Sequence, residues 1–325
     1  MRWPLMQAEP PAPPRRKVGL ALGSGSARGL AHIGVLRALR EANIEADLIA
    51  GSSVGALVGA AYASGKLEPL EAAFRGFDWK TVAFLLDPVF PRSGLIDGRK
   101  IAAFVRTHVP PARIEELPLP FRAVATDIMT GEEVAIDAGD IIEAVRASIA
   151  IPGILTPVRS NGRVLADGGL VNPVPVSTAR AMGADIVIAV DLNHDVIAHR
   201  MSLLKPPPDA KPNVMARLLD GMNAIDNPAL AQFRAWLKQE PLPGIFDVLA
   251  ASIYITQARI TEANLRYFKP DVLIQPPLGG VKFLEFNRAE EIIEIGYRAA
   301  CEQLEASAFV FEEPPATRKR WWQFR

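Results

Sequence analysis

Two short motifs hold the residues best suited to do chemistry in this chain. Residues 51–55 read Gly-Ser-Ser-Val-Gly, so Ser53 lies between Gly51 and Gly55, after an apolar run and before a helical pattern. A serine at a sharp turn from strand to helix presents its hydroxyl as a nucleophile, and flanking glycines leave room for the turn. The spacing predicts acyl transfer through Ser53, although an ordinary strand-to-helix turn would also use small residues here.

A serine nucleophile needs a base for its proton, and histidine is the usual one. The chain has four histidines, at positions 32, 108, 194 and 199. His32 falls on a predicted helix face, where packing is the more ordinary role. His108 precedes two prolines, and only His194 follows a strand. None of the four has a convincing triad position.

Asp167 is the stronger candidate for the base. It follows a short apolar run and precedes Gly168 and Gly169, which let the backbone pass close to another element. An Asp-Gly turn is common, so this signal is weak by itself. An aspartate with the ordinary pKa of about 3.9 is a poor base at neutral pH. Because burial raises the pKa of a carboxyl group, we expect a water-poor site around Asp167.

The elements that must position these residues alternate along the chain. Strands are expected at 18–22, 47–50, 120–127, 134–136, 164–166, 186–190 and 272–274. Helices are expected at 30–41, 56–62, 141–148, 177–182, 214–238, 244–268 and 288–304. This alternation predicts a mainly parallel sheet with helices on both faces. Between 68 and 120, aromatic and apolar residues predict helices and loops that cover the site, among them Phe74, Phe77, Trp79, Phe84, Leu85, Leu86 and Phe90.

Composition narrows the class of protein. The chain has 325 residues, of which 49% are apolar and 22% charged, as in a globular protein with a large core. Its formal net charge is zero, which gives no reason to expect a nucleic-acid partner. The apolar stretch around Ser53 is interrupted by glycine and serine, so no transmembrane helix is expected. A single cysteine, Cys301, excludes an internal disulfide and weakly favours a reducing compartment.

Four motifs in a fixed order resemble the patatin-like phospholipases, and most of all their bacterial branch related to neuropathy target esterase. They are the glycine loop at 23–29, the serine turn, Arg-Ala-Ser-Ile-Ala-Ile-Pro-Gly at 146–153, and Asp-Gly-Gly at 167–169 with Asn172. The resemblance spans roughly residues 17–175 and, more loosely, 271–300. It implies a three-layer α/β/α sandwich of the FabD/lysophospholipase-like kind.

The same resemblance implies a serine–aspartate dyad in place of a triad, with Ser53 as the nucleophile and Asp167 as the base. It assigns the oxyanion hole to the glycine loop, here the backbone N–H groups of Gly25 and Ser26 together with Arg28, which matches the family's loop arginine. Gly51 and Gly55 would form the elbow, while Gly168, Gly169 and Asn172 would support the base.

One departure from the family pattern affects the oxyanion loop. The family usually has a run of glycines there, whereas this chain has Ser24 and Ser26 between Gly23, Gly25 and Gly29. A serine still offers a backbone N–H. It tolerates fewer backbone conformations than glycine, so the geometry of the loop is less certain from the sequence.

The function implied is that of a serine lipid acyl hydrolase, which is a phospholipase, lysophospholipase or carboxylesterase that uses neither cofactor nor metal. Its partner is a lipid ester, whose natural head group the sequence does not fix. Residues 318–325 mix cations with Trp and Phe, so they suit contact with a membrane surface as well as they suit a disordered polar tail. A cytoplasmic place is expected, with peripheral contact to the inner membrane face left open.

The expected organisation is a disordered Pro-rich leader at 1–16, one domain at 17–305 and a basic aromatic tail at 306–325. Within the domain, the motifs lie in 17–180 and a helical and strand extension in 181–305. The sequence does not indicate an oligomeric state.

Three other functions compete with hydrolysis. A nucleotide-binding module would use Gly23 and Gly25 after the first strand, but no acidic residue closes the second strand to bind a ribose. A regulatory or scaffold protein could keep the fold without turnover, although Ser53 and Asp167 are both present. An acyltransferase would form the same acyl-enzyme and pass the acyl group to an alcohol or thiol.

Overall fold

The computed structural model describes residues 15–85, 94–109, 112–196 and 245–312. Several expectations therefore lie outside the described residues: most of the leader, the helix at 214–238, His199, Leu86, Phe90 and the cationic aromatic part of the tail. The division into leader, domain and tail stays a prediction.

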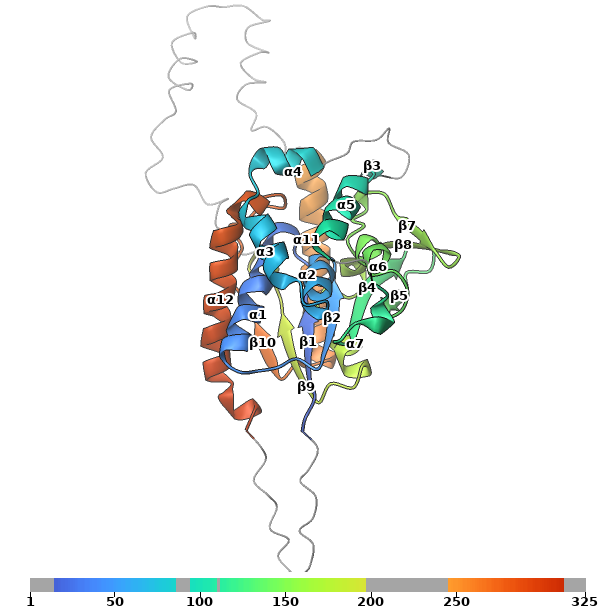
Figure 1. Cartoon of the computed structure of the whole chain (residues 1–325). Helices are drawn as coiled ribbons and strands as arrows, with labels where there is room; N and C mark the ends of the chain where they lie inside the picture. The colour runs from blue at the N-terminus through green and yellow to red at the C-terminus, as the bar shows by residue number, and fades with distance from the viewer. Residues whose placement is uncertain (1–14, 86–93, 110–111, 197–244, 313–325) are drawn as a thin grey trace, which may run out of the picture.

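A mainly parallel sheet forms the centre of the molecule (Figure 1). Within the described residues it has eight strands in the order β10-β9-β1-β2-β4-β8-β7, with β5 also paired to β4. The strands from β10 to β4 run parallel, whereas β5, β7 and β8 add antiparallel pairs. Their bounds are β1 Val18–Leu22, β2 Leu48–Ser52, β4 Phe121–Asp127, β5 Glu133–Ile136, β7 Val158–Ser160, β8 Arg163–Asp167, β9 Ile186–Val190 and β10 Val272–Ile274.

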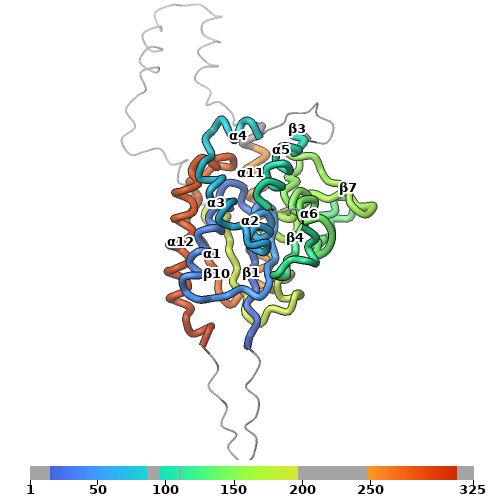
Figure 2. The backbone as a smooth tube through the Cα atoms, viewed as in Figure 1, coloured from blue at the N-terminus to red at the C-terminus, as the bar shows by residue number. Residues whose placement is uncertain are grey.

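Helices cover both faces of this sheet, which confirms the α/β/α fold class (Figures 1 and 2). The larger core packs against α1 (Ala31–Glu41), α2 (Val54–Ala63), α3 (Leu67–Arg75), α5 (Arg99–His108), α6 (Ile141–Ser148) and α12 (Ala289–Ala306). The smaller core packs against α7 (Val176–Ala181) and α11 (Ile245–Tyr267). Short elements complete the described chain: α4 Trp79–Leu85, β3 Gly94–Ile96, β6 Gly153–Leu155, η1 Ser26–Leu30, η2 Ile114–Glu116, η3 Gly168–Leu170, η5 Phe286–Arg288 and η6 Ala308–Val310.

Strand β1 shows why its short apolar sequence suits the middle of such a sheet. All five of its residues are buried. Leu20 and Leu22 enter the larger core, whereas Ala21 between them enters the smaller one. Successive side chains of a strand point to opposite faces, so a parallel strand covered on both sides needs a continuous apolar run.

The two edges of β4 determine where β8 ends. Residues 123–126 of β4 pair with β5, whereas residues 121–124 pair with β2 and residues 125–127 with β8. A strand has only two edges, and β5 occupies one of them over residues 123–126, which include residues that pair with β2 and residues that pair with β8. Strands β2 and β8 must therefore both lie on the other edge of β4, one after the other. The end of β8 is thus brought beside the end of β2.

The structure also differs in part from the expected elements. Strands β3, β6 and β7 were not expected, and β3 pairs with β6 in a small separate sheet. The pairing of β7 and β8 is local and antiparallel, so it leaves no helix between strands for a sequence pattern to reveal. Among the described helices, none is both long and apolar enough to cross a membrane.

Candidate active site

Ser53 lies at the turn between β2 and α2 in a backbone conformation that is rare for serine. Its φ is 55° and its ψ is −125°. A non-glycine residue in this region carries strain of roughly 1–3 kcal/mol, and such strain is typical of functional sites. The flanking glycines make the turn sterically possible: a Cβ atom on Gly55 would lie 2.1 Å from the Leu22 carbonyl oxygen, and one on Gly51 would lie 2.5 Å from the Gly55 oxygen.

Ser148 holds this strained turn in place. Its Oγ accepts a hydrogen bond from the Ser53 backbone N–H at 2.9 Å and donates one to the Val124 carbonyl at 2.5 Å. Ser148 is fully buried, so both bonds are shielded from water. The residue lies within the 146–153 motif, but no role was predicted for it because no local pattern indicates that it reaches the turn at Ser53.

Ser53 and Asp167 are brought together at the ends of β2 and β8. Ser53 Oγ donates a hydrogen bond of 2.5 Å to Asp167 Oδ2, and both residues are buried. The other carboxylate oxygen, Oδ1, accepts the Gly169 backbone N–H at 2.7 Å. The backbone of Asp167 is fixed as well, because its N–H donates to Ala150 and its carbonyl accepts from Thr126 Oγ1. Both carboxylate oxygens are thus oriented, with one directed at the nucleophile.

Burial tunes this carboxyl group toward neutral pH. It raises the pKa of Asp167 to about 7, against the lowering effect of the hydrogen bonds from Ser53 and the Gly169 N–H. An aspartate with that pKa can accept a proton far more readily than an ordinary one, because an effective base has a pKa near the working pH. The water-poor environment expected around Asp167 is present.

The three described histidines occupy other places. His32 is fully buried, and its Nε2 donates a 2.7 Å hydrogen bond to the Gly23 carbonyl. Burial lowers the pKa of His32 to about 4, although the bond to Gly23 raises it. His108 bonds the Phe104 carbonyl one helical turn away, and His194 lies 3.9 Å from Asp195. The partner of the Ser53 hydroxyl is a carboxylate.

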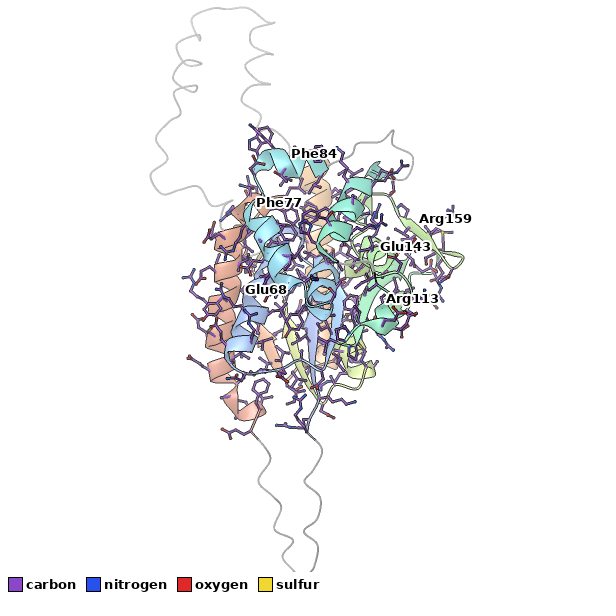
Figure 3. All side chains as sticks on the ribbon, in the orientation of Figure 1. Glu68, Phe77, Phe84, Arg113, Glu143 and Arg159 are labelled. Atoms are coloured by element: carbon purple, nitrogen blue, oxygen red, sulfur yellow. The ribbon has the colours of Figure 1, made fainter. Side chains whose placement is uncertain are left out.

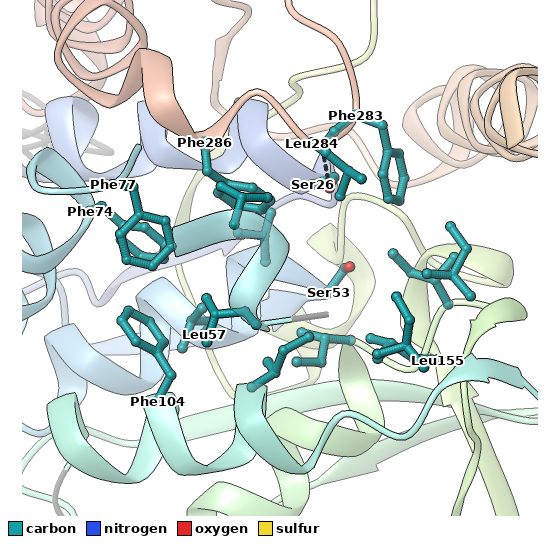
Figure 4. A pocket seen from close by; sticks show the side chains of 18 residues that line it. Ser26, Ser53, Leu57, Phe74, Phe77, Phe104, Leu155, Phe283, Leu284 and Phe286 are labelled. Carbon is teal, nitrogen blue, oxygen red and sulfur yellow. Dashed lines mark hydrogen bonds between the residues drawn. The ribbon is translucent and has the colours of Figure 1, made fainter. Parts of the chain in front are cut away.

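The loop after β1 carries two backbone N–H groups with no protein acceptor within the described part of the chain, those of Gly25 and Ser26. Ser26 adopts a φ of 51°, the left-handed region that a glycine would reach more easily. Its Oγ compensates by donating to the Phe283 carbonyl at 2.7 Å, which holds the residue in that conformation. Ser26 lines the same pocket as Ser53 (Figure 4).

Arg28 corrects the expectation that placed it in the oxyanion hole. Its guanidinium donates to the Val281 carbonyl at 3.1 Å and to Asn193 Oδ1 at 2.7 Å, and stacks 4.0 Å over the Tyr254 ring. Its backbone N–H donates to Gly25 O at 3.2 Å. A buried cation needs such partners. The Arg28 side chain therefore points into the interior of the protein and stabilises the loop through these contacts.

A buried polar cluster connects the glycine loop at 23–29 with α11. Asn193 Nδ2 donates to the Ser24 carbonyl and to Gln257 Oε1, each at 3.2 Å, and Ser24 Oγ donates to the same Gln257 oxygen at 3.1 Å. Gln257 also packs against Gly169, where an added Cβ would lie 2.3 Å from its Nε2. Gln257 therefore touches both the loop and the turn that holds Asp167. Asn193 and Gln257 were not predicted from the sequence, because each lies far along the chain from every motif.

Gly168 and Asn172 support the base indirectly. A Cβ on Gly168 would lie 2.2 Å from the Val124 carbonyl oxygen, so only glycine fits beside β4. The Asn172 backbone N–H donates to the Gly168 carbonyl at 2.9 Å, and its Nδ2 donates to Glu133 and Ser177, each at 2.9 Å. Asn172 ties the turn after Asp167 to β5 and α7.

An apolar pocket of about 120 Å³ opens onto Ser53 (Figure 4). Apart from Ser26 and Ser53, every described residue that lines it is apolar. Phe74, Phe77 and Phe104 form an aromatic cluster at one side, with ring centroids 5.0–5.4 Å apart. The other apolar lining residues are Val54, Leu57, Val82, Leu85, Ile96, Ile101, Ile149, Ile151, Ile154, Leu155, Phe283, Leu284 and Phe286.

The pocket corrects the expected cover in two ways. Trp79 and Phe84 were expected to cover the site, but they are 68% and 66% exposed and do not line the pocket. The expected Phe74, Phe77 and Leu85 do line it, together with segments around 149–155 and 283–286 that were not expected to do so. Both segments come close only through the tertiary fold, which a local pattern does not reveal.

Comparison with known proteins places this architecture in a family. Residues 20–180 match the family model described as patatin-like phospholipase. An uncharacterised NTE family protein of Mycobacterium tuberculosis is 37% identical over 337 residues, which cover 89% of this chain and 92% of the relative. The chain belongs to the patatin-like phospholipase family, in its NTE branch. The family resemblance inferred from the four motifs is therefore confirmed.

More distant NTE relatives are much longer proteins. Lysophospholipase NTE1 of Pyricularia oryzae is 30% identical over 294 residues, which cover 89% of this chain but 18% of the relative. Among solved structures, VipD from Legionella pneumophila aligns over 90% of this chain and 67% of its own, with 14% identity and a TM-score of 0.41.

Proposed function

We propose that this NTE family chain is a serine lipid acyl hydrolase that uses Ser53 as its nucleophile and Asp167 as its base. The observation that carries the proposal is the 2.5 Å hydrogen bond between Ser53 Oγ and Asp167 Oδ2 beside an apolar pocket. Family membership supports the same conclusion, and two fungal relatives are named lysophospholipases.

In the proposed acylation step, Ser53 Oγ attacks the ester carbonyl carbon while Asp167 takes the hydroxyl proton. The tetrahedral intermediate collapses when the bond to the leaving alcohol breaks, and protonated Asp167 returns its proton to that alcohol. The acyl group is then held as an ester of Ser53. Because Asp167 is already in hydrogen-bond contact with the hydroxyl, this proton transfer needs no movement of the backbone.

Backbone N–H groups would stabilise the negative charge on the ester oxygen. Gly25 and Ser26 supply the two donors in this proposal, and a donor of this kind contributes about 3–4 kcal/mol in serine hydrolases. Helix α2 begins at Val54, so the positive end of its dipole lies next to Ser53 and favours the same charge. Ser26 is held in place by its bond to Phe283, which keeps the hole preorganised.

Deacylation would use the same groups with water as the attacking species. The water oxygen bonds to the acyl carbon while Asp167 takes a proton from the water. The bond between the acyl carbon and Ser53 Oγ then breaks, and Ser53 Oγ recovers the proton from Asp167. The products are a fatty acid and the free enzyme. An alcohol in place of the water would give acyl transfer, so analysis of the products distinguishes hydrolase from transferase.

The pocket supports a lipid acyl group as the part of the substrate that is recognised. Its lining offers carbon surface along almost its whole extent, which favours an alkyl chain over a sugar or a peptide. Its polar atoms come from Ser26 and Ser53, where the ester group would lie. The head group would therefore remain outside the pocket.

Hydrolysis of p-nitrophenyl butyrate and of a lysophosphatidylcholine micelle tests the proposal. Ser53→Ala and Asp167→Asn should each lower kcat by at least about a thousandfold, by analogy with the removal of a member of a serine triad. Ser64→Ala is the matched control, because Ser64 ends the same helix and bonds only helix carbonyls. Full activity of the Ser53→Ala protein would refute the nucleophile.

A further inference from the structure

Helix α4 carries large apolar side chains on its outer surface as well as on the side toward the pocket. Val82 and Leu85 line the pocket. Trp79 and Phe84 are 68% and 66% exposed, although aromatic side chains of this size are normally well buried. Figures 1 and 3 show α4 across one end of the molecule, with Phe84 at its outer edge. One wall of the pocket is thus also an exposed aromatic surface.

The helices at this end of the molecule also carry cations. Helices α4 and α5 together contain Lys80, Arg99, Lys100 and Arg106 and no acidic residue. Lys100 joins the two helices, since its Nζ donates to the Phe84 carbonyl at 2.7 Å and lies 4.1 Å from the Phe84 ring centroid. We call Trp79, Lys80, Phe84 and Lys100 the α4 face.

Acidic groups near the α4 face are occupied by local contacts. Asp78 accepts from the backbone N–H and the hydroxyl of Thr81, each at 2.7 Å, at the start of α4. Asp97 forms an ion pair with Arg99. By contrast, α12 contains five glutamates and one arginine. Within the described helices, α4 and α5 thus carry cations without acidic residues, whereas α12 carries mainly anions.

We propose that the α4 face docks on the surface of an anionic lipid bilayer. Trp and Phe side chains partition into the interfacial region of a membrane, and nearby Lys residues are attracted to anionic head groups. The inference rests on the proposed function, because docking through α4 places a wall of the acyl pocket at the surface that holds lipid esters.

The charge pattern favours a bilayer over a second copy of the chain. In a two-fold dimer the same patch lies on both sides of the interface, so the lysines of one copy would face the lysines of the other. Like charges brought together this way oppose association. An anionic bilayer offers the complementary charge together with an apolar interior for the aromatic rings.

Vesicle binding of the full-length Ser53→Ala protein tests the inference without turnover. We use co-sedimentation with vesicles of phosphatidylcholine containing about one-third phosphatidylglycerol. Each ring would pass from water into the apolar part of the bilayer on docking, so Trp79→Ala and Phe84→Ala should each lower the partition coefficient about tenfold or more. Lys80→Gln and Lys100→Gln should each lower it about fivefold at low salt, and the loss should shrink as salt rises.

Phe309→Ala provides the matched control. Phe309 is 70% exposed, which is close to the values for Trp79 and Phe84. Phe309 lies after the C-terminal end of α12, a helix of 18 residues. The other end of α12 follows η5, which contacts α4, so the length of α12 separates Phe309 from the α4 face. A helix of that length spans about 27 Å. Its substitution should leave the partition coefficient unchanged.

The outcomes separate the docking surface from the catalytic proposal. Retained binding of the Trp79→Ala, Phe84→Ala double variant, or an equal loss in Phe309→Ala, would overturn the docking inference. The inference would also be overturned if light scattering without lipid showed that the double variant differs from the parent in oligomeric state. The α4 face would then serve association between protein chains. In the active background, the double variant should hydrolyse soluble p-nitrophenyl butyrate normally and vesicle lipid about tenfold or more slowly. Failure of Ser53 as nucleophile would leave the vesicle result unaffected.

The cationic aromatic tail calls for a separate arm, since it lies outside the described residues. The same comparison is made with chains that end at Pro315. If the shortened chain no longer binds vesicles, and substitution of Trp79 and Phe84 leaves the binding of the full-length chain unchanged, the tail is the contact and the α4 inference is wrong.

Discussion

Ser52 and Asp167 pair with successive residues on the same edge of β4, Ser52 with Val124 and Asp167 with Ala125. Strand β2 reaches this point in the parallel direction and β8 in the antiparallel direction. Residues separated by more than a hundred positions are thereby fixed through one shared strand. The 2.5 Å contact between Ser53 and Asp167 is thus a consequence of sheet register and does not depend on a flexible loop.

The raised pKa of Asp167 predicts that its ionisation destabilises the fold. Burial raises the pKa to about 7 in the folded chain, whereas an aspartate in an unfolded chain has a pKa of about 3.9. Between pH 4 and pH 7 the folded state holds a proton that the unfolded state has lost, so stability falls by about 1.4 kcal/mol per pH unit. Asp167→Asn cannot ionise and should gain stability relative to the parent as pH rises through this window.

Urea unfolding of the parent and Asp167→Asn at several pH values measures this difference. Taking the difference between the two proteins cancels the opposing effect of His32, whose pKa burial lowers to about 4. A difference in unfolding free energy that stays constant from pH 4 to pH 8 would show that Asp167 is not perturbed by burial.

Ser148→Ala should loosen the nucleophile turn. The substitution leaves the buried Ser53 N–H without its acceptor, which costs about 1–3 kcal/mol. Because Ser53 is held in a strained conformation, we expect kcat to fall about tenfold or more while KM changes little. Ser148→Cys keeps a side chain of similar size but with weaker hydrogen bonding. It therefore distinguishes the effect of the lost hydrogen bond from that of the lost volume. Unchanged kcat in a stably folded Ser148→Ala protein would show that the elbow holds itself.

Much of this site is predictable from sequence because its chemistry lies within short ordered motifs. Ser53 and the loop with Gly25 and Ser26 follow the parallel strands β2 and β1, and parallel strands carry their functional loops at their carboxyl ends. Asp167 ends the antiparallel strand β8, so it was found through its Asp-Gly-Gly motif. Ser148 also lies in a motif, but its contact with the Ser53 N–H is a tertiary fact that no periodicity encodes.

The remaining parts could not be predicted because they depend on contacts between distant segments. Arg28 looked like a site residue since it lies in the loop, yet the buried partners Asn193 and Tyr254 draw it inward. Trp79 and Phe84 looked like pocket cover because they are aromatic. Only packing decides which aromatic side chains of a helix face the interior.

Gln257→Leu should weaken the glycine loop at 23–29, the proposed oxyanion hole, without disturbing the apolar pocket. Gln257 Oε1 accepts from both Ser24 and Asn193, so the substitution leaves two buried donors without that acceptor. We expect a several-fold to tenfold loss of kcat with KM for p-nitrophenyl butyrate little changed, because the loop acts mainly in the transition state. Gln303→Leu on α12 serves as the control. A rise in KM alone would place Gln257 in substrate binding.

Phe104→Ala should shift the acyl-chain preference toward longer esters. Phe104 is half-buried and packs against Phe74 and Phe77 at one side of the pocket, so its removal opens space next to the chain. The ratio of kcat/KM for p-nitrophenyl laurate to that for the butyrate should rise. Phe268→Ala, at an exposed position outside the pocket, should leave the ratio unchanged. An unchanged ratio in Phe104→Ala would mean that the chain takes another path.

The most direct test of the dyad is the rate at which a fluorophosphonate labels Ser53 as a function of pH. Intact-mass and peptide analysis should find one adduct, on Ser53, and none in Ser53→Ala. The labelling rate should rise with pH and level off with an apparent pKa near 7, since ionised Asp167 takes the hydroxyl proton. In Asp167→Asn the labelling should be slow, and its rate should no longer depend on pH in this range. An adduct on another residue, or a parent rate that does not change between pH 5 and pH 9, would contradict the dyad.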